Sequence, residues 1–245
     1  MEEFVKDLIK KVLHKAGWKL GRETVMSSSS LQTAKSLEVH NINVVFDIGA
    51  NTGQFATELR AYGYTGKIVS FEPLPDAYAQ LVKLAAQDVS WIVHERCAVG
   101  AEAGSIKINV AGNSVSSSIL PMLTSHLDSA PQSKYTHTVE AKIITLDSVY
   151  SQYCKDKDIG FLKIDTQGYE WHVLDGASNS IAICKGLLLE LSLVPLYEGQ
   201  RLWHEFLTRL TTLKLALHAI QPSFIDDKTG QTLQFDAIFI KNKNE

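Results

Sequence analysis

The chain has 245 residues, of which 45% are hydrophobic and 21% are charged, and its formal net charge is −3. These values are typical of a globular protein with one large domain, and they argue against DNA or RNA as a main partner. Three widely spaced cysteines, Cys97, Cys154 and Cys184, indicate free thiols in a reducing compartment. We therefore expect a cytoplasmic protein with no signal peptide and no membrane span.

The N-terminal region, residues 1–36, is predicted to form a helix and a linker ahead of a main domain at residues 37–245. Residues 2–16 place apolar side chains on one helical face and lysines on the other. We expect this helix to pack on the main domain or on the partner subunit of a homodimer; the alternative is a helix at a membrane surface. The serines at 27–30 predict a hinge or loop.

Residues 44–48 form an apolar, β-branched run that predicts a strand buried on both faces. Gly49, Asn51 and Gly53 then predict a turn, and a helical pattern follows. A strand, a glycine turn and a helix bind phosphates or nucleotides in open α/β sheets. The G-x-x-x-G spacing matches neither the dinucleotide fingerprint nor the phosphate-binding loop. Asp47, near the end of the strand, disfavours a pyrophosphate and suits a ligand with ammonium and sulfonium charges.

The next two strands are predicted at residues 67–71 and 91–93, and the second of them leaves the sheet through residues 97–99. Glu72 lies about twenty residues beyond the glycine turn, where an acid accepts hydrogen bonds from ribose hydroxyls. The alternative is that Glu72 and Pro73 only end the strand. The small side chain of Ala98 would let an adenine ring lie flat, although it fits an ordinary core equally well.

The remaining pattern predicts an α/β fold with a mostly parallel sheet and an antiparallel terminal hairpin. Polar and apolar residues alternate over residues 106–110 and 138–144, which predicts antiparallel strands at a sheet edge. Residues 112–137 between them are predicted to form a long loop that closes over a site. Further strands and helices are expected at 146–153 (helix), 160–164 (strand), 169–177 (helix), 187–193 (strand), 202–213 (helix), 215–220 (strand) and 233–240 (strand).

Four predicted strands carry acids at or near their carboxyl ends: Asp47, Glu72, Asp165 and Glu190. Ligands bind at the carboxyl ends of the strands in open α/β sheets, so we expect these acids to surround one site. Capping of the following helix is the structural alternative for Asp165.

Several motifs in the same order resemble those of the FkbM family of S-adenosylmethionine-dependent methyltransferases. They are D-I-G-A-N-T-G, S-F-E-P, F-L-K-I-D-T-Q-G-Y-E, V-L-D-G-A, L-L-L-E-L-S-L-V-P-L-Y and F-D-A-I-F, and they cover about residues 40–240. The resemblance implies a Rossmann-like class I methyltransferase fold with a seven-stranded sheet. It also implies methyl transfer to an oxygen, often a hydroxyl of a sugar or a polyketide-type natural product.

The resemblance also implies roles for individual residues. Predicted cofactor contacts lie in the glycine turn and at the next strand ends: Asp47, Gly49, Asn51, Gly53, Gln54, Glu72, Pro73, Ala98 and Asp165. The D-T-Q-G-Y-E motif places Asp165 and Glu170 near the acceptor. Many relatives have Glu where this chain has Gln167, which implies a subfamily difference.

We expect Asp165 to be the general base that accepts the proton of the acceptor hydroxyl, with Glu190 or His172 as further candidates. Alternatively, Asp165 and Glu190 hold a divalent cation. Two other functions compete with methyl transfer: a nicotinamide-dependent oxidoreductase and a non-catalytic binding module. The glycine spacing and Asp47 argue against the first, and the acids at four strand ends argue against the second.

Overall fold

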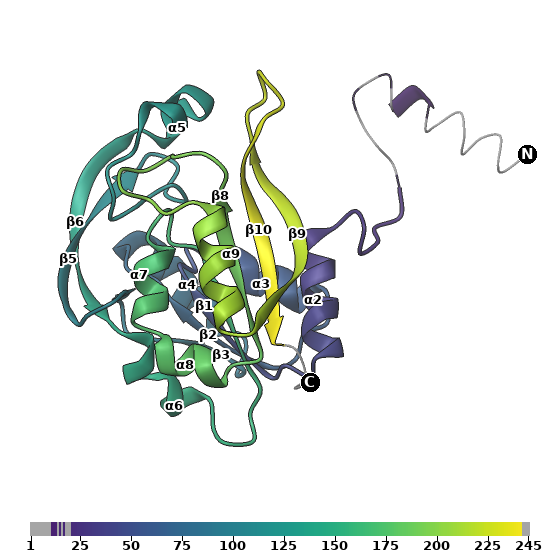
Figure 1. Ribbon diagram of the computed structural model, residues 1–245, viewed down its shortest axis with the longest axis vertical. Helices are drawn as coiled ribbons and strands as arrows, with labels where there is room; N and C mark the ends of the chain where they lie inside the picture. The colour runs from purple at the N-terminus through teal and green to yellow at the C-terminus, as the bar shows by residue number, and fades with distance from the viewer. Residues whose placement is uncertain (1–10, 14, 16, 18–20, 242–245) are drawn as a thin grey trace, which may run out of the picture.

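The computed structural model describes residues 11–13, 15, 17 and 21–241, so most of the predicted N-terminal helix lies outside the described residues. A seven-stranded sheet forms the centre of the molecule (Figure 1). The last two strand pairings at one edge of this sheet are antiparallel and the others are parallel, as predicted. In spatial order its strands are β3 (Trp91–Val93), β2 (Lys67–Phe71), β1 (Val44–Ile48), β7 (Gly160–Ile164), β8 (Gly186–Ser192), β10 (Thr232–Lys241) and β9 (Leu215–Ile225).

Strand β1 is buried on both faces because its residues alternate between two hydrophobic cores. Val45 packs in the core that contains Leu37 and Leu59, and Phe46 packs in the core that contains Phe206. The first core lies under α2 (Ser29–Val39), α3 (Gln54–Ala61) and α4 (Pro75–Ala85). The second core lies under α7 (Glu170–Asp175), α8 (Ser178–Ile183) and α9 (Trp203–Thr212), with α6 (Tyr150–Tyr153) beside them.

Three local predictions need correction. The serine run at 27–30 is not only a loop, because the hydroxyl of Ser28 caps α2 by accepting a hydrogen bond from Leu31 N at 3.3 Å. The helix predicted over 169–177 is divided into α7 and α8 around Gly176. A Cβ atom at Gly176 would lie 1.9 Å from the carbonyl oxygen of Gly100, so the chain passes against another backbone at this point. The helix predicted at 146–153 is η2 (Leu146–Ser148), a single 3₁₀ turn, followed by α6.

A second sheet of three strands corrects the prediction of antiparallel strands at an edge of the main sheet. Strands β5 (Gly104–Ala111) and β6 (Tyr135–Ile144) do pair antiparallel, but with each other and apart from the main sheet. Residues 98–99 form β4 (Ala98–Val99), which pairs with β6 instead of extending β3. Between β5 and β6 the chain forms α5 (Thr124–Ser129) and η1 (Pro131–Ser133), so this connection has structure of its own.

The terminal hairpin is longer than predicted, and strand β9 continues through Pro222 to Ile225. Pro222 lies opposite Phe235 at one of the register shifts of the β9–β10 pair. Proline is tolerated there because β9 is the last strand of the sheet in the described part of the chain. Cys97, Cys154 and Cys184 are buried and unpaired. Within the ranges described, no helix has both the length and the apolar character needed to cross a membrane.

Candidate functional site

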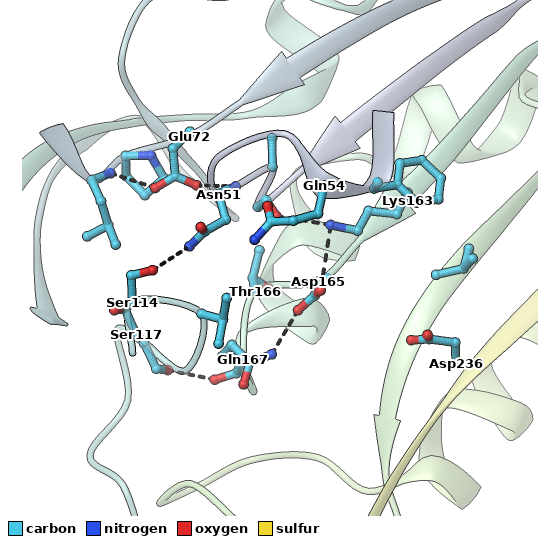
Figure 2. A pocket seen from close by; sticks show the side chains of 18 of the residues that line it. Asn51, Gln54, Glu72, Ser114, Ser117, Lys163, Asp165, Thr166, Gln167 and Asp236 are labelled. Carbon is cyan, nitrogen blue, oxygen red and sulfur yellow. Dashed lines mark hydrogen bonds and ion pairs between the residues drawn. The ribbon is translucent and has the colours of Figure 1, made fainter. Parts of the chain in front are cut away.

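A cavity of about 350 Å³ opens at the carboxyl ends of the central strands (Figure 2). Its walls come from the turns after β1, β2 and β7, the segment after β5, the first turn of α2 and strands β8, β9 and β10. The structure brings seven of the predicted site residues to this cavity: Gly49, Asn51, Gln54, Glu72, Pro73, Ala98 and Asp165. It does not bring five others to the cavity wall: Asp47, Gly53, Glu170, His172 and Glu190.

Close backbone approach explains the glycines of the first turn. Gly49 has a φ of +78°, and a Cβ atom there would lie 1.8 Å from the carbonyl oxygen of Asp165. Gly53 has a φ of +96° and lies against Trp91, where a Cβ atom would come within 2.8 Å of the ring. Only glycine meets both conditions without strain. The turn therefore brings the ends of β1 and β7 into direct contact and starts α3 at Gln54.

Glu72 connects the turn after β1 to the segment after β2 at the cavity. Its buried carboxylate accepts hydrogen bonds from the backbone N–H of Asn51 and of Leu74, both at 2.8 Å. Burial raises the pKa of Glu72 to about 7, although both hydrogen bonds act in the opposite direction. Next to Glu72 the wall becomes apolar, with Leu74, Ala98 and Ile108 on the cavity surface.

Asp47 is fully buried behind the cavity in an ion pair with Lys163, at 3.1 Å. Ser70 donates a hydrogen bond to the same carboxylate at 3.3 Å, and Lys163 also donates one to the carbonyl of Gly49 at 3.0 Å. Burial raises the pKa of Asp47, and the ammonium of Lys163 opposes this shift. Burial lowers the pKa of Lys163, but the carboxylates of Asp47 and Asp165 outweigh burial and raise it overall. Contact of Asp47 with a ligand stays a prediction.

Gln167 ties two of the predicted acids together. Its amide nitrogen lies 2.9 Å from Asp165 Oδ1 and 2.6 Å from Glu190 Oε2, and it donates to both. Its amide oxygen accepts a hydrogen bond from the hydroxyl of Tyr197 at 2.8 Å. The backbone of Gln167 is left-handed, with a φ of +54°, and its carbonyl accepts a bond from Ser118 at 2.6 Å. Asp165 is thus held in one orientation while a third of its side chain stays exposed to the cavity (Figure 2).

Glu190 lies behind Gln167 and faces a neighbouring acid on the next strand. It also accepts a bond from Gln234 at 2.9 Å, and it lies directly across from Asp236 on β10. Burial, followed by the charges of Asp165 and Asp236, raises the pKa of Glu190 well above its ordinary value. The same kinds of cause, burial first and then Asp165, raise the pKa of Asp236 to about 7. Burial and the neighbouring carboxylates thus favour the protonated forms of Glu190 and Asp236.

Besides Glu190, two further predicted catalytic residues lie away from the cavity wall. The buried carboxylate of Glu170 accepts bonds from the backbone N–H of Thr166 at 2.8 Å and of Gly168 at 3.1 Å, so it stabilises the turn after β7. Burial raises its pKa to about 7. His172 stacks on Tyr169 at 4.1 Å between ring centroids. Their positions favour a structural role for both residues over contact with an acceptor.

Sequence reasoning overlooked several residues of this site. Lys163 is a charged residue inside a strand that is otherwise apolar, and that was the available signal. Asp236 is a single acid in the apolar strand β10 and carries the same kind of signal. The first turn of α2 and Gln221 on β9 also line the cavity, and nothing in their sequence pattern indicates this.

No group of three or more His, Cys, Asp or Glu side chains is arranged to hold a metal ion within residues 21–241 and the few described before them. Gln167 instead directs its amide N–H groups at Asp165 and Glu190, the two acids predicted as metal ligands. The structure therefore offers a hydrogen-bonded arrangement at the position where the sequence suggested a cation.

The similar solved structures named below share 8–11% sequence identity with this chain. No curated protein matches the chain. Similar solved structures include a TehB-like S-adenosylmethionine-dependent methyltransferase from Corynebacterium glutamicum, with 11% identity over 98% of this chain and 97% of that one and a TM-score of 0.41. An rRNA methylase from Streptococcus thermophilus has 8% identity over 91% and 100% of the two chains, with a TM-score of 0.46. Fibrillarin from Aeropyrum pernix with natively bound S-adenosyl-L-methionine has 9% identity over 81% and 66%, with a TM-score of 0.46.

A family model supplies the assignment. The model described as the methyltransferase FkbM domain matches residues 47–217, which is more than half of the chain. The match begins at Asp47 and includes the glycine turn, Glu72 and the Asp165–Glu190 region. The chain belongs to the FkbM family of methyltransferases, whose cofactor is S-adenosylmethionine.

Proposed function

We propose that the protein transfers a methyl group from S-adenosylmethionine to a hydroxyl oxygen of a small molecule or glycan, with Asp165 as the general base. The observation that carries this proposal is the Asp165 carboxylate, which is fixed by Gln167 and exposed to the cavity next to the Gly49 turn. S-adenosylmethionine is compatible with this family assignment, whereas a nicotinamide cofactor is not.

The residues around the glycine turn fit this cofactor. Gly49 lines the cavity, and the carboxylate of Glu72 borders the cavity where ribose hydroxyls would lie. The apolar surface of Leu74, Ala98 and Ile108 would receive the adenine ring. Asp47 and Lys163 would act indirectly, since their ion pair holds the carbonyl of Gly49 in place.

When bound, S-adenosylmethionine supplies a methyl group on a sulfonium sulfur, which departs as a neutral thioether. A neutral hydroxyl is a weak nucleophile, so a base within hydrogen-bond distance increases the rate by about 10²- to 10⁴-fold. Asp165 accepts the hydroxyl proton as the oxygen bonds to the methyl carbon. Gln167 orients Asp165, and Glu190 anchors Gln167 from behind.

The charges on the cavity wall favour a neutral acceptor. Four acidic side chains line it, those of Glu58, Glu72, Asp165 and Asp236, of which Glu72 and Asp236 have a pKa of about 7. The ammonium of Lys163 is already paired with Asp47 and Asp165. An excess of carboxylates repels phosphate groups, which argues against a nucleic acid acceptor. Carboxylates accept hydrogen bonds from hydroxyl groups, which suits a sugar or a hydroxylated natural product.

The test combines calorimetry with turnover. S-adenosylhomocysteine should bind the wild-type protein and NAD should not, because only the former matches the family's cofactor. Asp165→Asn should reduce formation of S-adenosylhomocysteine in a metabolite and glycan extract by about 10²- to 10⁴-fold. The affinity for S-adenosylhomocysteine should change by less than about threefold, because the amide keeps the bulk and polarity of the carboxylate.

The control is Asp156→Asn, which replaces an exposed acid in the loop before β7, at the opposite ends of the strands. This variant should turn over as the wild type does. Near-normal turnover by Asp165→Asn would remove Asp165 as the base, and full activity after thorough chelation would remove a divalent cation from the reaction.

We also propose a cytoplasmic location, supported by the three buried, unpaired cysteines. A homodimer stays a proposal as well. Light scattering on the protein would decide it, and a monomeric mass at all concentrations would contradict it.

A further inference from the structure

The cavity extends well beyond the part that the cofactor is expected to fill. Glu72 follows β2, Gly49 follows β1 and Asp165 follows β7, and the lining then continues to Asp236 on β10 and Gln221 on β9. Neighbouring strands lie about 4.8 Å apart, so the four steps from β1 to β9 cover about 19 Å. The residues proposed for the cofactor lie on the β2 and β1 side of the cavity and extend to Asp165 after β7, which leaves the part of the lining beyond β7 for another molecule.

This second half has a distinct chemistry. Ser29, Ser30 and Thr33 from α2 line this half, with the hydroxyl of Ser30 bonded to Glu58, and Gln221 contributes an amide. Asp236 lies directly across the strand pair from Gln221, so the two side chains leave the same face of the sheet. We call this wall, made of Ser29, Ser30, Thr33, Gln221 and Asp236, the α2–β9 wall.

Hydrogen bonds fix the α2–β9 wall before any ligand arrives. The amide nitrogen of Gln221 lies 3.1 Å from the carbonyl of Ser29, 2.9 Å from Gln32 Oε1 and 3.3 Å from Thr33 Oγ1. Gln221 is only 4% exposed and Thr33 only 2%. Since the amide nitrogen is committed to α2, the amide oxygen of Gln221 is the atom suited to accept a bond from a ligand hydroxyl.

Phe55 and Leu188 supply apolar surface beside these polar groups. Both line the cavity, Phe55 in the first turn of α3 and Leu188 on β8 next to Lys163. An apolar patch bordered by hydroxyl, amide and carboxylate groups suits a ring that has apolar C–H faces and hydroxyl edges. Glu58 and Asp236 on the same side disfavour an anionic ring.

The α2–β9 wall also lies outside the part of the chain that the family model matches. The match covers residues 47–217, whereas the wall comes from residues 29–33, 221 and 236. The family domain thus supplies the proposed cofactor half, and the flanking segments of this chain supply the other half.

We infer that the α2–β9 wall is the acceptor subsite and that Thr33 and Gln221 determine which neutral, hydroxyl-bearing ring is accepted. This inference rests on the proposed methyl transfer. The methylated hydroxyl lies at Asp165 on β7, and the remainder of the ring extends over Leu188 toward Gln221. Thr33 acts on the acceptor through Gln221, whose amide it helps to hold.

The test measures binding of neutral methyl hexosides and methyl deoxyhexosides to the protein loaded with S-adenosylhomocysteine, with methyl uronates as anionic probes. Titration by calorimetry or ligand-observed NMR gives the affinities. We expect at least one neutral glycoside to bind and every uronate to bind at least tenfold more weakly than its neutral counterpart. Failure of all neutral glycosides to bind, or equal binding of the uronates, overturns the inference.

Two variants locate the subsite. Gln221→Leu and Thr33→Val should weaken binding of the glycoside by at least tenfold and about threefold, respectively, while the affinity for S-adenosylhomocysteine stays within twofold. Thr33→Ser keeps the hydroxyl and should bind as the wild type does, which controls for loss of packing. Gln221→Glu keeps the volume and should lower the affinity as well, because it adds a carboxylate.

The outcomes separate this inference from the proposed function. If the wild-type protein binds S-adenosylhomocysteine and the glycoside, but Gln221→Leu leaves glycoside binding unchanged, the subsite is elsewhere and methyl transfer stands. If S-adenosylhomocysteine itself does not bind, the proposed function fails first. Unchanged cofactor affinity in the Gln221→Leu variant also shows that the variant is folded.

Discussion

The buried ion pair between Lys163 and Asp47 provides the sharpest test of how this site is held together. The side chain of Lys163 is 7% exposed and that of Asp47 is 0% exposed. Lys163→Met keeps the length of the side chain but removes the ammonium. It leaves the Asp47 carboxylate with only the Ser70 hydroxyl at 3.3 Å, and the carbonyl of Gly49 loses its donor. Removing one partner of a buried pair costs about 3–5 kcal/mol of unfolding free energy.

The two single variants should differ, because their remaining partners differ. In Asp47→Asn, Lys163 keeps the Gly49 carbonyl at 3.0 Å and Asp165 at 3.6 Å, so we expect a smaller loss than in Lys163→Met. The double variant should lose less than the sum of the two single losses, because no unpaired charge stays buried. Lys35→Met removes an exposed ion pair with Glu38 at 2.8 Å and should change stability by less than about 1 kcal/mol.

Urea denaturation followed by tryptophan fluorescence measures these free energies of unfolding. Repeating the measurement at several pH values tests the role of the Asp47 charge. Burial already raises the pKa of Asp47, and loss of the Lys163 ammonium raises it further. A carboxyl with a raised pKa in the folded state regains stability as the pH falls. The penalty of Lys163→Met should therefore shrink from pH 8 to pH 5. A loss below about 1 kcal/mol at pH 8, or strictly additive single losses, refutes the account.

Three further predictions follow from contacts in the same region. Gly49→Ala should abolish binding of S-adenosylhomocysteine in calorimetry, because its Cβ would meet the Asp165 carbonyl at 1.8 Å; wild-type affinity contradicts this. Glu170→Gln should become more stable relative to wild type by about 3 kcal/mol of unfolding free energy as the pH rises from 4.5 to 8, measured by urea titration. The reason is that the wild-type protein loses stability as Glu170, with a pKa of about 7, ionises; a difference that does not change with pH contradicts this. Tyr197→Phe should lower kcat at least tenfold while cofactor affinity stays unchanged, because Gln167 loses a bond at 2.8 Å; equal kcat contradicts this.

The main sheet was predictable because its signals are local. The run from Val44 to Ile48 is apolar throughout, and its alternate residues fill two cores, as expected for a strand covered by helices on both sides. The positive φ values at Gly49 and Gly53 confirm the predicted turn. Acids that follow parallel strands lie at one edge by geometry alone, which is why Glu72 and Asp165 both reach the cavity.

The second sheet was not predictable in the same way. Alternating patterns at β5 and β6 indicate that two strands pair, but they do not state whether the pair joins an existing sheet. Two residues, Ala98 and Val99, are too few to indicate a strand by their pattern. They pair with Ile143 and Ile144, about 45 residues further along the chain, and a local sequence pattern does not reveal a partner at that distance.

Partners within the site were hidden for a related reason. The sequence shows Lys163 two residues before Asp165, yet only the parallel register of β1 and β7 reveals that Lys163 lies directly beside Asp47. Gln167 was noted only as a difference from relatives. Its contacts with Glu190 and Tyr197 join residues 23 and 30 positions away in the chain.

Pro222 affects how the molecule behaves among copies of itself. Strand β9 ends the sheet in the described part of the chain and exposes Leu217, Ile220 and Ile225. An apolar edge of this kind invites a strand from another molecule to add to the sheet, which is a common start of aggregation. Pro222 has no N–H to offer an incoming strand, and the register shifts beside it disturb the regular ladder. The hairpin that completes the cavity thus also limits intermolecular strand addition at its own edge.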